Sequence, residues 1–196
     1  MGTRSLVLKP HGDGFEGRYV HFDGYPTGVG IALLRIVKRD GLEKARKIII
    51  DDHYYWSCIN ESMFSTRYDL ASKDIVTNDY TDSPTGNVVL LGEQRGVAPS
   101  VDVVGYGEAD LNSPRGEEEY AEYLVTPESY GEHGWVEWTY LLAESGLWVA
   151  PYNADENPPR YQIVVPWDGA ESILENYSEQ YNEEADRLWA LQNARG

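Results

Sequence analysis

The chain has 196 residues, of which 41% are hydrophobic, and it carries 33 Asp and Glu against 16 Lys and Arg, a formal net charge of −17 at pH 7. This length and apolar content suit one domain with its own core, so we expect residues 1–196 to form a single α+β domain. The negative charge argues against direct binding to nucleic acid or to an anionic membrane.

The first third of the chain predicts a hairpin followed by two helices. Strands over residues 3–8 and 15–22 flank a glycine-containing turn at 11–14. Alternation predicts that one face of the second strand carries Phe15, Gly17, Tyr19 and His21, and the other Arg18, Val20 and Phe22. Thr27 is the predicted N-cap of a helix that runs through Arg39 and ends at Gly41. A second helix is predicted over residues 42–50.

The rest of the chain predicts short strands and then one long helix. Strands are expected over residues 88–91, 101–106 and 161–165, with a hairpin over 135–152 that turns at Gly146. A helix over about residues 170–194 follows, with an apolar stripe opposite an acidic side. The expected architecture is an antiparallel sheet of hairpins with helices packed on one face and a C-terminal acidic amphipathic helix.

Negative charge is concentrated in the second half of the chain. Residues 1–98 hold 13 acidic and 12 basic side chains, whereas residues 99–196 hold 20 and 4. Five of these acids recur every three or four positions on the last helix, about 6 Å apart along its axis: Glu171, Glu175, Glu179, Glu183 and Asp186. This row is either a solvated face or a rigid line of charge that imitates a nucleic-acid backbone and binds a basic protein.

The most distinctive local motif is the segment His21-Phe-Asp-Gly-Tyr-Pro-Thr-Gly-Val-Gly30. N–H groups at the start of the following helix could bind an anion, which makes candidates of Arg18, His21, Asp23 and Tyr25. The alternative is a turn in which Asp23 only caps the backbone. The glycines do not form a dinucleotide fingerprint, because the full spacing and the expected strand–helix–strand order are missing.

This motif and the opening Met1-Gly-Thr-Arg-Ser-Leu6 resemble a group of small uncharacterised proteins from phages and actinobacteria. The resemblance covers mainly residues 1–34 and is weaker at 104–108 and over the 135–152 hairpin. It implies an accessory gene of a phage or mobile element and brings no activity with it.

Other chemistry is not indicated, and we expect no catalytic residue, metal or cofactor. Asp51 and Asp52 are adjacent and point in different directions, and the chain has only four histidines, so His53 does not complete a zinc pattern. There is no Gly-x-Ser-x-Gly elbow, and the acidic run 117–119 fits a solvated loop. The single cysteine, Cys58, excludes an internal disulfide and fits a reducing compartment.

Two functions follow as hypotheses. No apolar run has the length of a membrane span, and residues 1–8 do not form a signal peptide, so we expect a cytoplasmic protein, in the host cytoplasm if phage-encoded. The first hypothesis is a non-enzymatic counter-defence protein that binds a basic host protein through its acidic half. The alternative is a protein that sequesters or hydrolyses a nucleotide-like molecule at the segment holding His21, Asp23 and Tyr25. The oligomeric state stays open.

Overall fold

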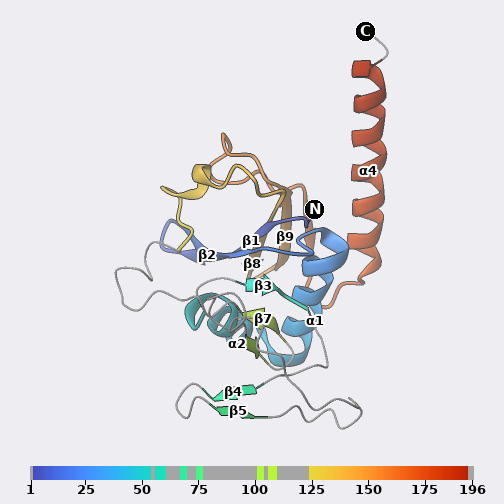
Figure 1. Cartoon of the computed structure of the whole chain (residues 1–196). Coiled ribbons are helices and arrows are strands. Elements are labelled where there is room, and N and C mark those ends of the chain that lie inside the picture. Colours follow the sequence, from blue (N-terminus) through green and yellow to red (C-terminus); the bar gives the residue numbers. More distant parts are fainter. Residues whose placement is uncertain are drawn as a thin grey trace.

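The computed structural model describes residues 2–53, 56–60, 67–69, 74–76, 101–103, 106–109 and 124–193. Within these ranges, one eight-stranded sheet has the order β10-β9-β8-β1-β2-β3-β7-β6, and β4 and β5 form a separate pair (Figure 1). The strands are β1 Ser5–His11, β2 Gly14–Val20, β3 Trp56–Cys58, β4 Arg67–Asp69, β5 Asp74–Val76, β6 Val101–Val103, β7 Gly107–Ala109, β8 Trp138–Ala143, β9 Gly146–Pro151 and β10 Ile163–Val165. The helical elements are η1 Pro26–Gly30, α1 Ile31–Asp40, α2 Leu42–Arg46, η2 Lys47–Asp51, η3 Tyr130–Glu132 and α4 Ser172–Asn193.

The predicted N-terminal hairpin is confirmed and lies at the centre of the sheet. β1 and β2 pair in antiparallel register from Ser5 opposite Val20 to His11 opposite Gly14. Gly12 allows the tight turn, because its φ of +54° lies in the left-handed region. On the side of β2 away from β1, the Gly17 and Val125 backbones exchange hydrogen bonds of 2.9 and 3.0 Å.

The prediction of a purely antiparallel sheet is wrong, because the sheet is mixed. β8 pairs with β1 in parallel, and β3 pairs with β2 in parallel at Val20 and Trp56. Neither parallel pair is joined by a hairpin. The connection from β2 to β3 runs through η1, α1, α2 and η2. A crossover of this kind brings the chain back in the same direction. The glycine segment after β2 therefore does stand in strand–helix–strand order, contrary to the sequence-based expectation.

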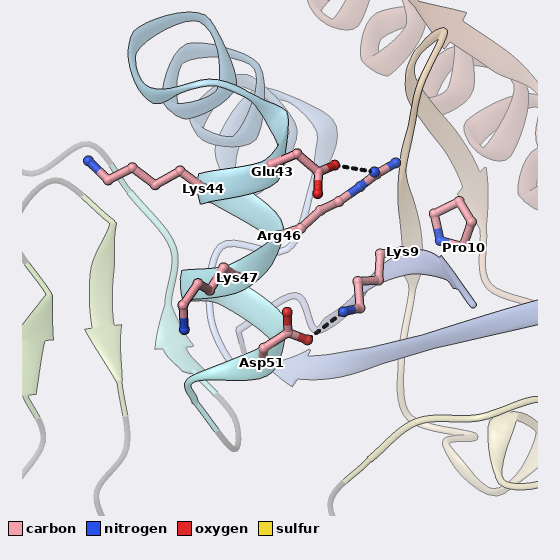
Figure 2. Close-up of a pocket in the computed structure, with 7 residues that line it drawn as sticks. All are labelled: Lys9, Pro10, Glu43, Lys44, Arg46, Lys47 and Asp51. Carbon is pink, nitrogen blue, oxygen red and sulfur yellow. Dashed lines mark hydrogen bonds and ion pairs between the residues drawn. The ribbon is translucent and has the colours of Figure 1, made fainter. Parts of the chain in front are cut away.

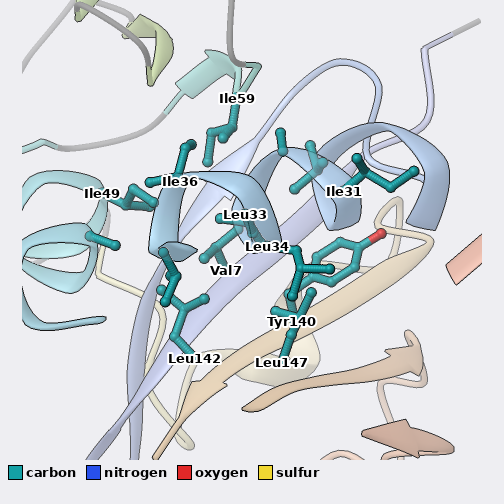
Figure 3. Packing of buried hydrophobic residues seen from close by; sticks show 14 of the residues in the cluster. Val7, Ile31, Leu33, Leu34, Ile36, Ile49, Ile59, Tyr140, Leu142 and Leu147 are labelled. Carbon is teal, nitrogen blue, oxygen red and sulfur yellow. The ribbon is translucent and has the colours of Figure 1, made fainter. Parts of the chain in front are cut away.

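The two faces of the sheet carry separate cores. Val7 of β1 faces the helices and packs in one cluster with Leu33 and Ile36 of α1 and Tyr140 of β8 (Figure 3). Leu6 and Leu8 point the other way, as strand alternation requires. They join a second cluster with Phe15, Val125, Tyr130 and Val136. α1 and α2 thus cover one face, and the segment that includes η3 covers the other.

The helices after β2 begin differently from the prediction and end as predicted. Helical structure starts at Pro26, with Tyr25 as N-cap and no side-chain capping bond, so Thr27 lies inside the first turn and is not the cap. Proline suits this position because its missing N–H has no partner to lose. Gly41, with φ of +87°, ends α1 and donates its N–H to the Val37 carbonyl.

The second predicted hairpin is confirmed as β8 and β9, with Ala143 opposite Gly146. Gly146 has φ of +148°, and a Cβ there would lie 2.3 Å from the Val165 carbonyl oxygen, so only glycine fits beside β10. β6 and β10 fall within two of the predicted strands. The predicted strand over residues 88–91 and the acidic run 117–119 lie outside the described residues.

α4 is attached to the body of the protein only near its start, and it extends away from the sheet (Figure 1). Leu174 is completely buried and joins the helix-side core. Tyr177 and Tyr181 then contact the Trp138 ring, at centroid distances of 5.9 and 4.7 Å. From Glu179 to Arg187 every residue is exposed. No helix in the described ranges has the length and apolar content needed to cross a membrane.

Candidate functional site

The glycine-rich segment after β2 folds into a compact turn that uses its own N–H groups. Asp23 adopts a φ of +57°, its carbonyl accepts the Val29 N–H at 2.9 Å, and Tyr25 accepts the Gly28 N–H at 2.9 Å. The Tyr25 hydroxyl reaches the Asp23 carboxylate at 3.5 Å. A Cβ on Gly28 would lie 2.2 Å from the Asp23 carbonyl oxygen, so the glycine permits this turn. The N–H groups of Gly28 and Val29, which an anion would need, are therefore already bonded to backbone carbonyls.

The four predicted ligand-binding residues do not converge. Arg18 is fully buried on the helix side of the sheet, where its Nε donates to the Ile50 carbonyl at 2.8 Å. His21 follows β2 and lies on the opposite face of the sheet from Arg18. It contacts Tyr19, two residues earlier in the chain. Asp23 and Tyr25 lie exposed on the turn beyond them. Arg18 thus supports the crossover helices, and the structure separates it from the other three.

His21 belongs to an aromatic cluster that the sequence did not reveal. The Tyr19 hydroxyl lies 2.8 Å from His21 Nδ1, and the Phe22 ring meets the His21 ring edge-on at 4.3 Å. Burial raises the pKa of Tyr19, and the nearby Arg4 and Trp135 side chains partly offset this rise. Phe22 and Trp135 remain 46% and 60% exposed. We refer to Arg4, Tyr19, His21, Phe22 and Trp135 as the aromatic cluster.

The tautomer of His21 decides which atom of the Tyr19–His21 pair donates the hydrogen bond. Strand alternation pointed to the Tyr19–His21 pair, whereas Arg4 and Trp135 precede β1 and β8 and no local pattern marks them.

The acidic row divides into an anchor and an exposed part. Glu171 precedes α4 and receives two hydrogen bonds from Arg35 of α1, Nε at 2.7 Å and Nη2 at 2.5 Å. These bonds lower the pKa of the Glu171 carboxyl. The remaining four acids of the row are exposed on α4 and form no ion pair with any residue in the described ranges: Glu175, Glu179, Glu183 and Asp186.

An open cavity of about 600 Å³ lies between the end of β1 and the α2–η2 segment (Figure 2). Its walls carry four cations, which suggests an anion site at first sight: Lys9, Lys44, Arg46 and Lys47. Each of them already faces carboxylates, which together number six: Glu16, Asp40, Glu43, Asp51, Asp52 and Glu144. Arg46 also donates to the Leu142 carbonyl at 2.6 and 3.0 Å. The cavity wall is therefore an ion-pair network that attaches α2 to the sheet.

The acidic pair at the end of η2 is structural. Asp51 and Asp52 accept from Lys9 and Lys47, each at 2.5 Å. The His53 Nδ1 lies 2.6 Å from the Ile48 carbonyl, and burial lowers the pKa of this imidazole. Within the described ranges, no group of three His, Cys, Asp or Glu side chains is placed to hold a metal ion.

Comparisons of the chain with protein-family models, with curated proteins and with solved structures found no match.

Proposed function

We propose that this chain is a non-enzymatic accessory protein, of the kind carried by phages and mobile elements, that binds a basic host or defence protein through α4. The proposal rests on one observation above all. α4 extends beyond the body of the protein and presents four acidic side chains to solvent, none of them in an ion pair with a described residue. Charge complementarity then predicts a partner with a basic surface, such as a surface that otherwise contacts nucleic acid.

The energetics of the row support a role in binding. Like charges one helical turn apart destabilise a helix by a few tenths of a kcal/mol per pair, and α4 itself contains only one base, Arg187. A basic partner removes this repulsion on binding. The long-range field of a chain with net charge −17 also accelerates encounter with such a partner, mainly through the association rate.

A competition experiment tests nucleic-acid mimicry directly. The tagged protein captures its partner from host lysate at low salt, and duplex DNA is then added. If the carboxylate row occupies a nucleic-acid surface, DNA displaces the protein and high salt prevents capture. A partner that binds DNA and this protein at the same time contradicts mimicry.

A matched pair of triple variants tests the role of α4. Glu175→Gln, Glu179→Gln and Glu183→Gln remove three charges from the row while preserving size and helix propensity. The control removes three exposed charges elsewhere, by Asp13→Asn, Glu132→Gln and Asp155→Asn. We expect the α4 variant to slow association at least about tenfold and the control to change it little. Equal effects of the two variants would show that only net charge matters.

A further inference from the structure

The apolar side of α4 continues past the point where the helix leaves the body of the protein. Apolar residues recur along it every three or four positions: Tyr177, Tyr181, Ala185 and Leu188. Tyr177 is half-buried, and Tyr181 contacts the Trp138 ring at 4.7 Å but remains 37% exposed. Ala185, one turn further along, is exposed. We refer to Tyr181 and Ala185 as the open stripe.

A helix that only presents charge to solvent does not need this pattern. An apolar stripe along one side is typical of a helix that packs against another element, whereas a fully solvated helix is polar all round. The part of α4 from Tyr181 to its end at Asn193 spans about 18 Å, or about three turns. Isolated helical segments of this length are marginal in water, so a partner packed on the open stripe would stabilise this part of α4.

Carboxylates lie on both sides of the open stripe. Glu184 and Asp186 precede and follow Ala185, so each is turned about 100° from it around the helix, in opposite directions. Both are exposed, and neither forms an ion pair with a residue in the described ranges. Because α4 contains five acids and one base, two copies packed through α4 would repel each other. Charge complementarity therefore disfavours a second copy and favours a partner with basic side chains beside its apolar contact.

We propose that the open stripe binds an amphipathic helix whose apolar side is flanked by lysine or arginine. This inference rests on the proposed function and specifies its partner, because the basic surface that α4 binds is then one side of a helix. The partner's apolar residues pack on Tyr181 and beside Ala185, whose small side chain lets the two helix axes approach to about 8–10 Å. Its basic side chains then reach Glu184 on one side and Asp186 on the other.

Two synthetic peptides of identical composition test this pairing with the full chain, by fluorescence anisotropy. One consists of two repeats of Leu-Lys-Lys-Leu-Leu-Lys-Lys, which places leucine on one side of a helix about 21 Å long. The other contains the same residues in an order that distributes leucine around the helix. At about 0.15 M salt, where exposed charges more than about 8 Å apart are largely screened, we expect the amphipathic peptide to bind at least about tenfold more tightly.

Two single variants separate the open stripe from net charge. Ala185→Glu and Asn176→Glu each add one negative charge at an exposed position, and these positions are about two and a half turns apart, on opposite sides of α4. Ala185→Glu should weaken binding of the amphipathic peptide about fivefold or more, because it places a charge within the apolar contact. Asn176→Glu should leave binding unchanged or slightly tighter. Glutamate is a good helix former, and circular dichroism verifies that both variants stay helical.

The outcomes separate this inference from the proposed function. Equal binding of the two peptides, or binding that Ala185→Glu leaves unchanged or strengthens, overturns helix docking and leaves attraction by the acidic row standing. Binding of the amphipathic peptide that the triple variant Glu175→Gln, Glu179→Gln and Glu183→Gln leaves unchanged supports the open stripe and counts against the row. Failure of both peptides to bind contradicts both proposals. A dimer of the chain alone that Ala185→Glu dissociates, measured by analytical ultracentrifugation, shows that a second copy covers the open stripe and also overturns helix docking.

Discussion

Leu174→Ala tests whether one buried side chain holds α4 against the body of the protein. Leu174 is completely buried, and its two methyl groups lie 3.5 and 3.7 Å from where a Cβ on Gly30 would stand. Leu-to-Ala changes in cores cost about 2–5 kcal/mol, with the lower values where the surroundings can collapse. Because α4 contacts the body of the protein mainly at η1 and at the Trp138 ring, near the start of the helix, we expect a loss near the lower limit, about 2 kcal/mol.

The loss should be local to α4. Isolated helices are marginal in water, and the like-charge row weakens this one further. A loss of about 2 kcal/mol in docking corresponds to about a 30-fold faster amide exchange in α4. Amides of β1 and β8 should keep most of their protection, because among the described side chains α4 contributes only Leu174 and the partly buried Tyr177 to the cluster that contains Val7, and none to the cluster that contains Leu6.

Hydrogen exchange measured by mass spectrometry checks this expectation, with Gly30→Ala as a second variant. Alone, the new methyl meets the Tyr140 ring at 3.2 Å, a tight contact. Combined with Leu174→Ala it fills part of the cavity, so the double variant should lose less protection than the two single changes summed. Unchanged exchange in α4, or a parallel loss in β1 and β8, would refute a local anchor at Leu174.

Three further predictions concern charge and the turn. Hydrogen bonds from Arg39 and Tyr106 hold the pKa of Asp40 well below its usual range, so its contribution to stability is present above about pH 4 and is lost as pH falls further. Urea unfolding should therefore show Asp40→Asn less stable than wild type at neutral pH, with a smaller difference near pH 3, and a pH-independent difference contradicts this. Gel shifts should show no DNA or RNA binding at about 0.15 M salt and no effect of Lys44→Glu with Lys47→Glu, because carboxylates already neutralise these lysines; a salt-sensitive shift lost in this variant argues otherwise. Asp23→Ala should lower the free energy of unfolding by about 1 kcal/mol and Asp23→Gly should not, because φ of +57° strains alanine; equal thermal melts for the two variants show that the turn stores no such strain.

The sequence alone determined the elements whose signals are local. Alternation along β2 placed Arg18 and Tyr19 on opposite faces, and the structure confirms both positions. Turn glycines marked both hairpins, because positive φ at Gly12 and Gly146 is a property of a few neighbouring residues. Gly41 ended α1 for the same reason.

Only the tertiary structure decided which strands lie side by side and which side chains meet. The parallel pairs of β1 with β8 and of β2 with β3 depend on long connections that no local periodicity encodes. The same pairing brings Trp135 near Tyr19 from a distant part of the chain, and it brings Arg18 to the Ile50 carbonyl of η2, which lies 32 residues further along the chain. The sequence showed the spacing of the acidic residues on the last helix. Only the packing of the helix showed that Glu171 binds Arg35, whereas the other carboxylates of the row lie in solvent.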